Sequence, residues 1–263
     1  MRKKHTITSI LKSKSSELLT MITAYDALFA KLFDETADII LVGDSLNMSF
    51  NGKNDTVSAT LEQMIYHTQA VCRGAKNSFI ICDMPFGTYY NKEVALENAI
   101  KVFQQTTCDA IKIEGGAEKA DIVEFLTSNA VAVCGHIGLL PQSVRKEGGY
   151  KFKGRDEEDA QKLIEDAVAI ENAGAFCIIV EGVKAEVASR IATSVKVPVV
   201  GIGAGDGVDG QVLVFSDMLG LFEEFTPKFV KKYLDGALHV KESVEKYSNE
   251  VKSRQFPSSE HTY

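Results

Sequence analysis

The segment DAIKIEGG at positions 109–116 places a lysine and a glutamate two residues apart in an otherwise apolar run. In an extended strand, Lys112 and Glu114 would point to the same side. Alternating apolar and charged residues usually mark a strand with one face in solvent. If both faces of this strand are covered, the two charges must instead form a buried pair or belong to a site.

Polar residues also close four other apolar runs. They are Asp44 and Ser45 after 38–43, Asp83 at the end of 78–83, His136 after 130–135 and Glu181 at the end of 175–181. Active sites of α/β proteins are built at the carboxyl ends of parallel strands, so this recurrence indicates one shared site. Taken singly, each position could equally be a helix cap or a turn residue.

Three of these residues, Asp44, Asp83 and Glu114, offer only carboxylate oxygen atoms. Such ligands on separate strands suit Mg²⁺, which usually keeps waters and leaves coordination positions for a substrate. Without a cation the carboxylates would repel one another, so a metal ion or Lys112 is expected among them. A carboxylate–lysine network without metal is the alternative.

The remaining candidates have different chemistry. Lys112 could neutralise a substrate carboxylate or a developing enolate oxygen. His136 could hydrogen-bond a substrate, and a lone histidine can equally be structural. Glu181 ends a very apolar strand, where loss of solvent would raise its pKa toward that of a useful general base.

The elements that must position these residues alternate between strands and helices. Strands are predicted at 18–23, 38–43, 78–83, 110–114, 130–135, 175–181, 197–203 and 211–217, and helices at about 60–73, 92–105, 163–172, 185–193 and 227–240. Alternation of this kind produces parallel sheets through right-handed crossovers. Eight strands in about 250 residues predict a closed (β/α)8 barrel, with an open doubly wound sheet as the alternative.

No linker or repeat divides the chain, so residues 1–263 are predicted to form a single barrel domain. A short basic arm (about 1–17) would precede it, and a loosely ordered tail (about 248–263) would follow it. The segment GDGVDG at 205–210 matches G-x-G-x-x-G, but a strand-like run follows it. The dinucleotide fingerprint requires a helix there, so no such site is predicted.

The composition limits the kinds of molecule that are expected to bind this protein. The net charge of −7 and pI near 5.4 argue against nucleic acid or an anionic membrane surface as the main partner. No apolar stretch approaches the roughly 20 residues of a membrane span, and the basic N-terminus leads into polar residues rather than a signal peptide. Five cysteines without a C-x-x-C pair indicate reduced core residues. A cytoplasmic location is expected.

Several longer motifs resemble the ketopantoate hydroxymethyltransferases. They are TAYD (23–26), LVGDSL (41–46), YHTQAVCRGA (66–75), DMPFGTY (83–89), IKIEGG (111–116), GHIGLLPQSV (135–144), GIGAG (201–205) and DGQVLVFSDMLGL (209–221). The resemblance implies a (β/α)8 barrel that transfers a one-carbon unit from 5,10-methylenetetrahydrofolate to 3-methyl-2-oxobutanoate, which gives 2-dehydropantoate for pantothenate biosynthesis. It also implies a homo-oligomer, often a decamer.

Carried over by motif, Asp44, Asp83 and Glu114 would bind Mg²⁺. Asp44, Ser45, Asp83 and Lys112 would contact the oxo acid, Glu181 would be the proton acceptor, and His136 would support it. The C–H next to the keto group would be acidified by the metal, and Lys112 would help to hold the enolate that attacks the folate methylene carbon. No nucleophilic side chain is needed.

The sequence departs from the family pattern at Asn47, where glycine is usual, at Leu140, where threonine is usual, at Lys184, where proline is common, and at Val208, where cysteine is common. None of these positions is a charged site residue. Two other functions are considered: a Mg²⁺-dependent C–C or P–C lyase that resembles isocitrate lyase or phosphoenolpyruvate mutase, and a non-catalytic barrel that binds an oxo acid.

Overall fold

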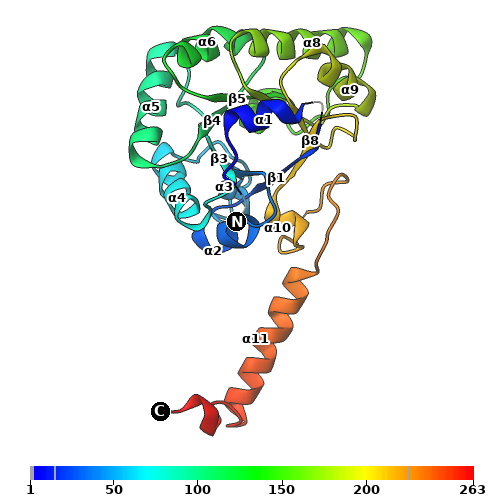
Figure 1. The fold of residues 1–263 in the computed structure, drawn as a ribbon. Coiled ribbons are helices and arrows are strands. Elements are labelled where there is room, and N and C mark those ends of the chain that lie inside the picture. Colours follow the sequence, from blue (N-terminus) through cyan, green and yellow to red (C-terminus); the bar gives the residue numbers. More distant parts are fainter. Residues whose placement is uncertain (1–2, 15, 224) are drawn as a thin grey trace. The chain divides into compact units, whose positions relative to one another are not determined.

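Eight short parallel strands pair in sequence order, and the last pairs with the first, so the sheet closes into a barrel (Figure 1). The computed structural model describes residues 3–14, 16–223 and 225–263. The strands are β1 (Leu19–Thr23), β2 (Ile39–Val42), β3 (Phe79–Asp83), β4 (Ala110–Glu114), β5 (Val133–Gly138), β6 (Cys177–Glu181), β7 (Val199–Ile202) and β8 (Gly210–Leu213). The predicted barrel is confirmed, and the open sheet is wrong.

Helices cover the outside of the barrel (Figure 1). They are α2 (Ala27–Phe33), α4 (Leu61–Gly74), α5 (Lys92–Gln105), α6 (Ala120–Ser128), α8 (Glu157–Asn172) and α9 (Ala185–Ser194), with a 3₁₀ turn η1 (Ala117–Lys119) before α6. Thr60 forms a capping box with Gln63, which satisfies two backbone N–H groups that a helix start leaves unpaired. Asn91 caps α5 through its side chain, which accepts from the N–H of Val94.

Strand β5 begins and ends three residues later than the sequence predicts. Helix α6 ends in a Schellman motif, in which the N–H of Val131 donates to Leu126 O and the N–H of Ala130 donates to Thr127 O. Ala130 adopts a φ of 64° there, so it turns the chain instead of extending it. His136 therefore lies inside β5 and pairs in register with Glu114, whereas the sequence placed it after the strand.

The return from β7 to β8 uses a glycine-rich segment, 203–209, in which the structure assigns no helix. A Cβ at Gly205 would lie 2.5 Å from Cβ of Ala185, and one at Gly207 would lie 2.9 Å from Cβ of Ser189. Both neighbours belong to α9, so the glycines let this segment pack directly on that helix. Strand β8 follows at Gly210, which agrees with the rejection of a dinucleotide fingerprint.

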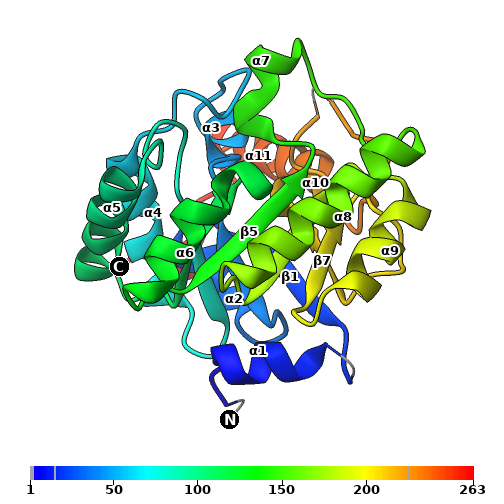
Figure 2. The ribbon, with the colours of Figure 1, turned by 90° about the horizontal axis from the view of Figure 1, so that it is seen from above.

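Helix α1 (Ile7–Ser13) lies across one end of the barrel, opposite the end that carries α7 (Val144–Glu147) (Figure 2). Ile10 of α1 is fully buried in the main core cluster. Other members of that cluster come from all eight strands and from the residue before β6: Leu19, Met21, Ile39, Leu41, Phe79, Ile81, Ala110, Cys134, Phe176, Cys177, Ile179, Val200, Ile202 and Val212. This end is therefore filled by apolar side chains, and the predicted basic arm contributes a packed helix to it.

The chain divides into two compact units, residues 1–214 and residues 215–263. The second unit contains α10 (Phe215–Met218), α11 (Gly236–Lys252) and a 3₁₀ turn η3 (Ser259–His261). The helix predicted at 227–240 begins only at Gly236, because a turn closed by the hydrogen bond from Val230 N–H to Pro227 O lies before it. Helix α11 runs on to Lys252, and Arg254 then turns the chain with a φ of 58°. The single-domain division and the bounds of the arm and tail stay predictions.

No helix among the described residues is both long and apolar enough to cross a membrane. The five cysteines are all free and buried, as expected for reduced core residues.

Asp34, directly after α2, ties that helix to the start of β3. Its carboxylate accepts hydrogen bonds from the backbone N–H groups of Lys76, Asn77 and Ser78 at 2.7–2.9 Å. Burial disfavours the charged carboxylate, but these hydrogen bonds outweigh that effect and lower the pKa of Asp34.

Replacing Asp34 with asparagine should lower the free energy of unfolding at pH 7 by about 1–3 kcal/mol, because an amide cannot accept from all these donors. The folded-state pKa lies below the unfolded value, so the contribution is present above the unfolded pKa and is lost as pH falls through the folded pKa. Denaturant unfolding at pH 7 and in acid should show a difference that shrinks in acid. The exposed neighbour Glu35→Gln is the control.

Candidate active site

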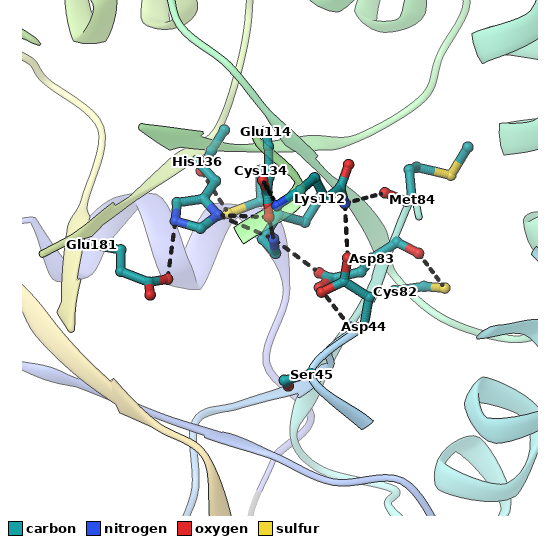
Figure 3. A network of polar contacts seen from close by, with 12 residues as sticks. Asp44, Ser45, Cys82, Asp83, Met84, Lys112, Glu114, Cys134, His136 and Glu181 are labelled. Carbon is teal, nitrogen blue, oxygen red and sulfur yellow. Dashed lines mark hydrogen bonds and ion pairs between the residues drawn. The ribbon is translucent and has the colours of Figure 1, made fainter. Parts of the chain in front are cut away.

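Strand register brings the charged residues together at one end of the barrel. Asp83 on β3 is in register with Lys112 on β4, Glu114 on β4 with His136 on β5, and Gly138 on β5 with Glu181 on β6. Because neighbouring parallel strands run level, matched positions place their side chains side by side. The residues predicted at five separate strand ends are therefore brought together in the fold (Figure 3).

Lys112 lies at the centre of this group. Its Nζ is 3.3 Å from Asp83 Oδ1, 3.8 Å from Glu114 Oε1 and 3.2 Å from His136 Nδ1. Lys112 and Glu114 are each 4% exposed, so the reading of this strand as half in solvent is wrong. Burial lowers the pKa of Lys112, but the nearby carboxylates of Asp83, Glu114 and Asp44 raise it by more. The pKa therefore lies above its usual value. The amine is therefore protonated at neutral pH.

Asp44, Asp83 and Glu114, together called the carboxylate cluster, surround the lysine. The backbone N–H of Asp44 donates to Asp83 Oδ2 at 2.9 Å, which fixes the loop after β2 against β3. Burial and the neighbouring carboxylates Asp83 and Glu114 raise the pKa of Asp44 well above its usual value. Burial also raises the pKa of Asp83, against the effect of Lys112. Three carboxylates thus share one lysine, and burial with their mutual repulsion disfavours the ionisation of all three at once.

His136 connects the cluster to Glu181. Its Nδ1 is 3.6 Å from Glu114 Oε1 and its Nε2 is 3.3 Å from Glu181 Oε2. Burial and Lys112 oppose protonation of the ring, but the neighbouring carboxylates of Glu114 and Glu181 outweigh them and raise the pKa of His136 to about 9. The ring thus lies between two carboxylates that favour its protonated form, as Figure 3 shows for its position.

Glu181 differs from the other acids in its exposure. Its side chain is 20% exposed, whereas those of Asp83 and Glu114 are 3% exposed. The sequence suggested that the apolar strand would remove Glu181 from solvent, but the side chain stays partly exposed. Its carboxylate stands at the open side of the group, where it can meet an incoming molecule.

Ser45 lies beside the cluster, directly before the short helix α3 (Leu46–Ser49). Its Oγ shares a 2.8 Å hydrogen bond with the hydroxyl of Tyr25, a fully buried residue after β1. The backbone oxygen of Tyr25 is in turn 2.6 Å from His67 Nδ1 on α4. Tyr25 and His67, which were not singled out from the sequence, thus hold Ser45 in place.

Gln142 is a second residue that the sequence reasoning missed. It belongs to the 3₁₀ turn η2 (Pro141–Ser143) after β5. Its backbone N–H donates to Glu114 Oε2 at 3.0 Å, and its side chain contacts Asp44, Met84 and Tyr89. The signal available in the sequence was the motif GHIGLLPQSV, which places a proline-led turn just after a candidate strand.

Asn47, one of the departures from the family pattern, is buried in α3. Its Nδ2 donates to Asp55 O at 2.8 Å and to Ser58 Oγ at 3.0 Å, and its Oδ1 accepts from Asn51 Nδ2 at 3.2 Å. Arg145 of α7 pairs with Asp55 at 2.9 Å, so the loop that Asn47 braces also carries the contact to α7. In this chain the side chain that replaces glycine organises the loop 51–58.

Replacing Asn47 with alanine should lower the free energy of unfolding by about 1–3 kcal/mol, because three hydrogen bonds between this buried side chain and the loop are lost. The loop should also be cut faster by a protease, which can be followed by mass spectrometry of the fragments. Asn54→Ala, an exposed change in the same loop, is the control. Equal stability and equal cleavage in both variants would show that the brace is not needed.

The carboxylate cluster has donor atoms that fit a hard cation. Asp83 Oδ1 and Glu114 Oε1 are buried and have no hydrogen-bond partner among the described residues. In the part of the chain that the structure describes, no group of three or more His, Cys, Asp or Glu side chains is arranged to hold a metal ion by itself. The donor atoms that are present suit an ion such as Mg²⁺, which usually keeps several waters and binds through one or two carboxylates.

The fold belongs to a known class of barrels. A phosphoenolpyruvate phosphomutase from Streptomyces platensis subsp. rosaceus superposes with a TM-score of 0.62 over 95% of this chain and 88% of that chain, at 12% identity. A 2,3-dimethylmalate lyase of the PEP mutase/isocitrate lyase superfamily superposes with a TM-score of 0.61 over 97% and 88%, at 14% identity. At this identity the likeness defines the architecture alone, a (β/α)8 barrel with its polar residues at the strand ends.

Sequence comparison then identifies the family. Residues 4–259 match the ketopantoate hydroxymethyltransferase family. The 3-methyl-2-oxobutanoate hydroxymethyltransferase of Sulfurimonas denitrificans is 69% identical over the full length of both chains, and that of Aliarcobacter butzleri is 65% identical over 99% of this chain and 97% of that protein. The chain belongs to the ketopantoate hydroxymethyltransferase family, and the resemblance seen in the sequence is confirmed. It is an enzyme of the transferase class.

Proposed function

We propose that this enzyme transfers the one-carbon unit of 5,10-methylenetetrahydrofolate to 3-methyl-2-oxobutanoate and gives 2-dehydropantoate and tetrahydrofolate. The observation that carries the proposal is the buried protonated Lys112 among three carboxylates, with Glu181 and His136 beside them. This set offers a cation for a negative oxygen and a separate carboxylate for a proton. It contains no activated nucleophile, and none is needed for an enolate to attack a methylene carbon.

We propose Asp44, Asp83 and Glu114 as the residues that hold Mg²⁺. With Glu181 the group has four carboxylates. When all four are ionised, they exceed the positive charges of protonated Lys112 and His136 by two, which one divalent cation would balance. The buried oxygens Asp83 Oδ1 and Glu114 Oε1, which have no hydrogen-bond partner among the described residues, support the assignment. When bound, the cation would supply Lewis acidity toward the oxo acid.

The residues of the chain perform the other steps. Lys112, with Ser45, Asp44 and Asp83 around it, would bind the oxygen atoms of the oxo acid. Glu181 would take the proton from C3, and the electron pair of that C–H bond would pass to the enolate, whose oxygen the Lys112 ammonium stabilises. The folate methylene carbon is bonded to two nitrogens. One of these C–N bonds would break as C3 bonds to the methylene carbon, and the other would break as water supplies the hydroxyl oxygen. The proton taken from C3 and one proton of that water would end on the two nitrogens of tetrahydrofolate.

His136 would support Glu181 through their 3.3 Å contact. An imidazolium there keeps the carboxylate of Glu181 oriented toward the open side and ties it to Glu114. His136 therefore acts on Glu181 and not directly on the carbon that reacts.

Proton exchange tests this assignment and separates it from the two alternatives. With Mg²⁺ and 3-methyl-2-oxobutanoate in D₂O, the enzyme should exchange the C3 proton without folate and should form 2-dehydropantoate when 5,10-methylenetetrahydrofolate is added. NMR follows both reactions. Exchange on a different oxo acid would favour a C–C or P–C lyase. No exchange and no product would favour a barrel that only binds an oxo acid.

A homo-oligomer is also proposed, a decamer by family resemblance, in the cytoplasm. Helix α11 and the segment before it carry exposed apolar side chains that a second copy could cover: Phe225, Phe229, Tyr233, Leu234, Leu238, Val240, Val244, Tyr247 and Val251. Exposed apolar patches of this kind mark association surfaces. Light scattering gives the mass in solution, and a monomer at micromolar concentration would contradict this proposal.

A further inference from the structure

Every polar group of the Gln142 side chain has a partner. Nε2 donates to Asp44 Oδ2 at 2.9 Å and to Met84 O at 3.0 Å, and Oε1 accepts from the hydroxyl of Tyr89. Met84 O can only accept, so the nitrogen must face it, and the orientation of the amide follows. Gln142 and Tyr89 are 7% and 6% exposed.

The backbone of the same residue reaches a second carboxylate. Helical first turns leave N–H groups without intrahelical partners, and η2 directs that of Gln142 to Glu114 Oε2 at 3.0 Å. Gln142 thus contacts acids that follow β2 and end β4, although it lies after β5. Glu114 Oε1, on the other side of that carboxylate, has no hydrogen-bond partner among the described residues.

Tyr89 supports the side chain of Gln142 through a hydrogen bond to its Oε1. It lies in the loop between β3 and α5, so its hydroxyl joins a third loop to the amide. Without that donor, Gln142 Oε1 would be a buried acceptor with no partner, and the side chain would gain freedom to rotate. Residues that orient ligating carboxylates in this way commonly set metal affinity.

We propose that Gln142, held by Tyr89, is a positioning residue that orients Asp44 and Glu114 for a divalent cation. The inference rests on the proposed function in one respect, namely that these carboxylates bind the ion. The Tyr89–Gln142 pair would set how tightly the cation binds and would take no part in the chemistry of the reaction.

Binding of Mn²⁺ to the full-length enzyme without substrates tests the inference, because free Mn²⁺ is measured directly by its electron paramagnetic resonance signal. Gln142→Met keeps the side-chain length and removes its hydrogen bonds, so the Kd should rise by about 10- to 100-fold. Tyr89→Phe removes only the support and should raise the Kd by a smaller factor. Matched controls are Gln69→Met, whose Nε2 contacts Gln105 O on the exterior, and Tyr66→Phe on α4.

The outcomes are distinguishable. If the unaltered enzyme does not bind Mn²⁺, the proposed metal site is wrong. If it binds Mn²⁺ and both variants keep its Kd within twofold, the positioning role is wrong. A lower melting temperature in the variants would not change that conclusion, because a merely structural role predicts lower stability with unchanged Mn²⁺ binding. If Gln142→Met does not fold, Tyr89→Phe decides the question alone.

Discussion

Replacing Glu181 with glutamine should slow exchange of the C3 proton of 3-methyl-2-oxobutanoate by about 10²- to 10⁴-fold, the usual contribution of a positioned general base. Glutamine has nearly the same shape and cannot accept the proton. Glu181 is the most exposed acid of the group, and its contact is with His136 rather than with Lys112, so the carboxylate cluster should remain intact. Binding of Mn²⁺ should therefore change little while exchange is lost.

Exchange is measured by NMR in D₂O with Mg²⁺ and without folate. Glu186→Gln, an exposed change on α9, is the matched control and should exchange at the unaltered rate. A Glu181→Gln enzyme that exchanges as fast as the control would remove Glu181 from the role of base. Loss of Mn²⁺ binding in the same variant would instead indicate that Glu181 is a ligand.

Replacing Lys112 with methionine should lower the rate of hydroxymethyl transfer by about 10²- to 10³-fold or more, because the enolate oxygen loses a charged donor. The effect on the cation should have the opposite sign. Lys112 Nζ is 3.3 Å from Asp83 Oδ1 and repels any cation held there, so its removal should leave Mn²⁺ binding equal or tighter.

Stability supplies a second measurement on the same variant. Removing one partner of a buried charge network costs about 3–5 kcal/mol, so Lys112→Met should unfold more easily when no divalent cation is present. Addition of Mg²⁺ should raise its melting temperature more than that of the unaltered enzyme. Lys101→Met on α5, where the lysine is exposed, is the control. Weaker Mn²⁺ binding in Lys112→Met would show that the lysine supports the cation site instead of opposing it.

The sequence predicted the closed barrel and the charged residues of the site because both depend on local patterns. Strand β4 matches its prediction residue for residue, since Asp109 precedes the run and two glycines follow it. The gathering of Asp83, Lys112, Glu114 and Glu181 followed from a general property of parallel sheets, whose carboxyl ends meet at one edge. No distance between side chains was needed for that step.

Other features depend on contacts between distant parts of the chain. The start of β5 was misplaced because Ala130 and Val131 look like strand residues but end α6 in a Schellman motif. Gln142 was missed because its partner Asp44 is 98 residues away and glutamine carries no charge to draw attention. The bracing role of Asn47 was invisible because it depends on how the loop 51–58 folds back on α3.

Helix α1 and the apolar core fill one end of the barrel, opposite the end that carries α7. Under the proposed function, an oxo acid at Lys112 would lie deeper than a folate that reaches the more exposed Glu181. An ordered cycle is then expected, in which the oxo acid enters before the folate and its product leaves after the folate product. The packing of Ile10, far from the polar residues, would contribute to that order by closing the opposite end of the barrel.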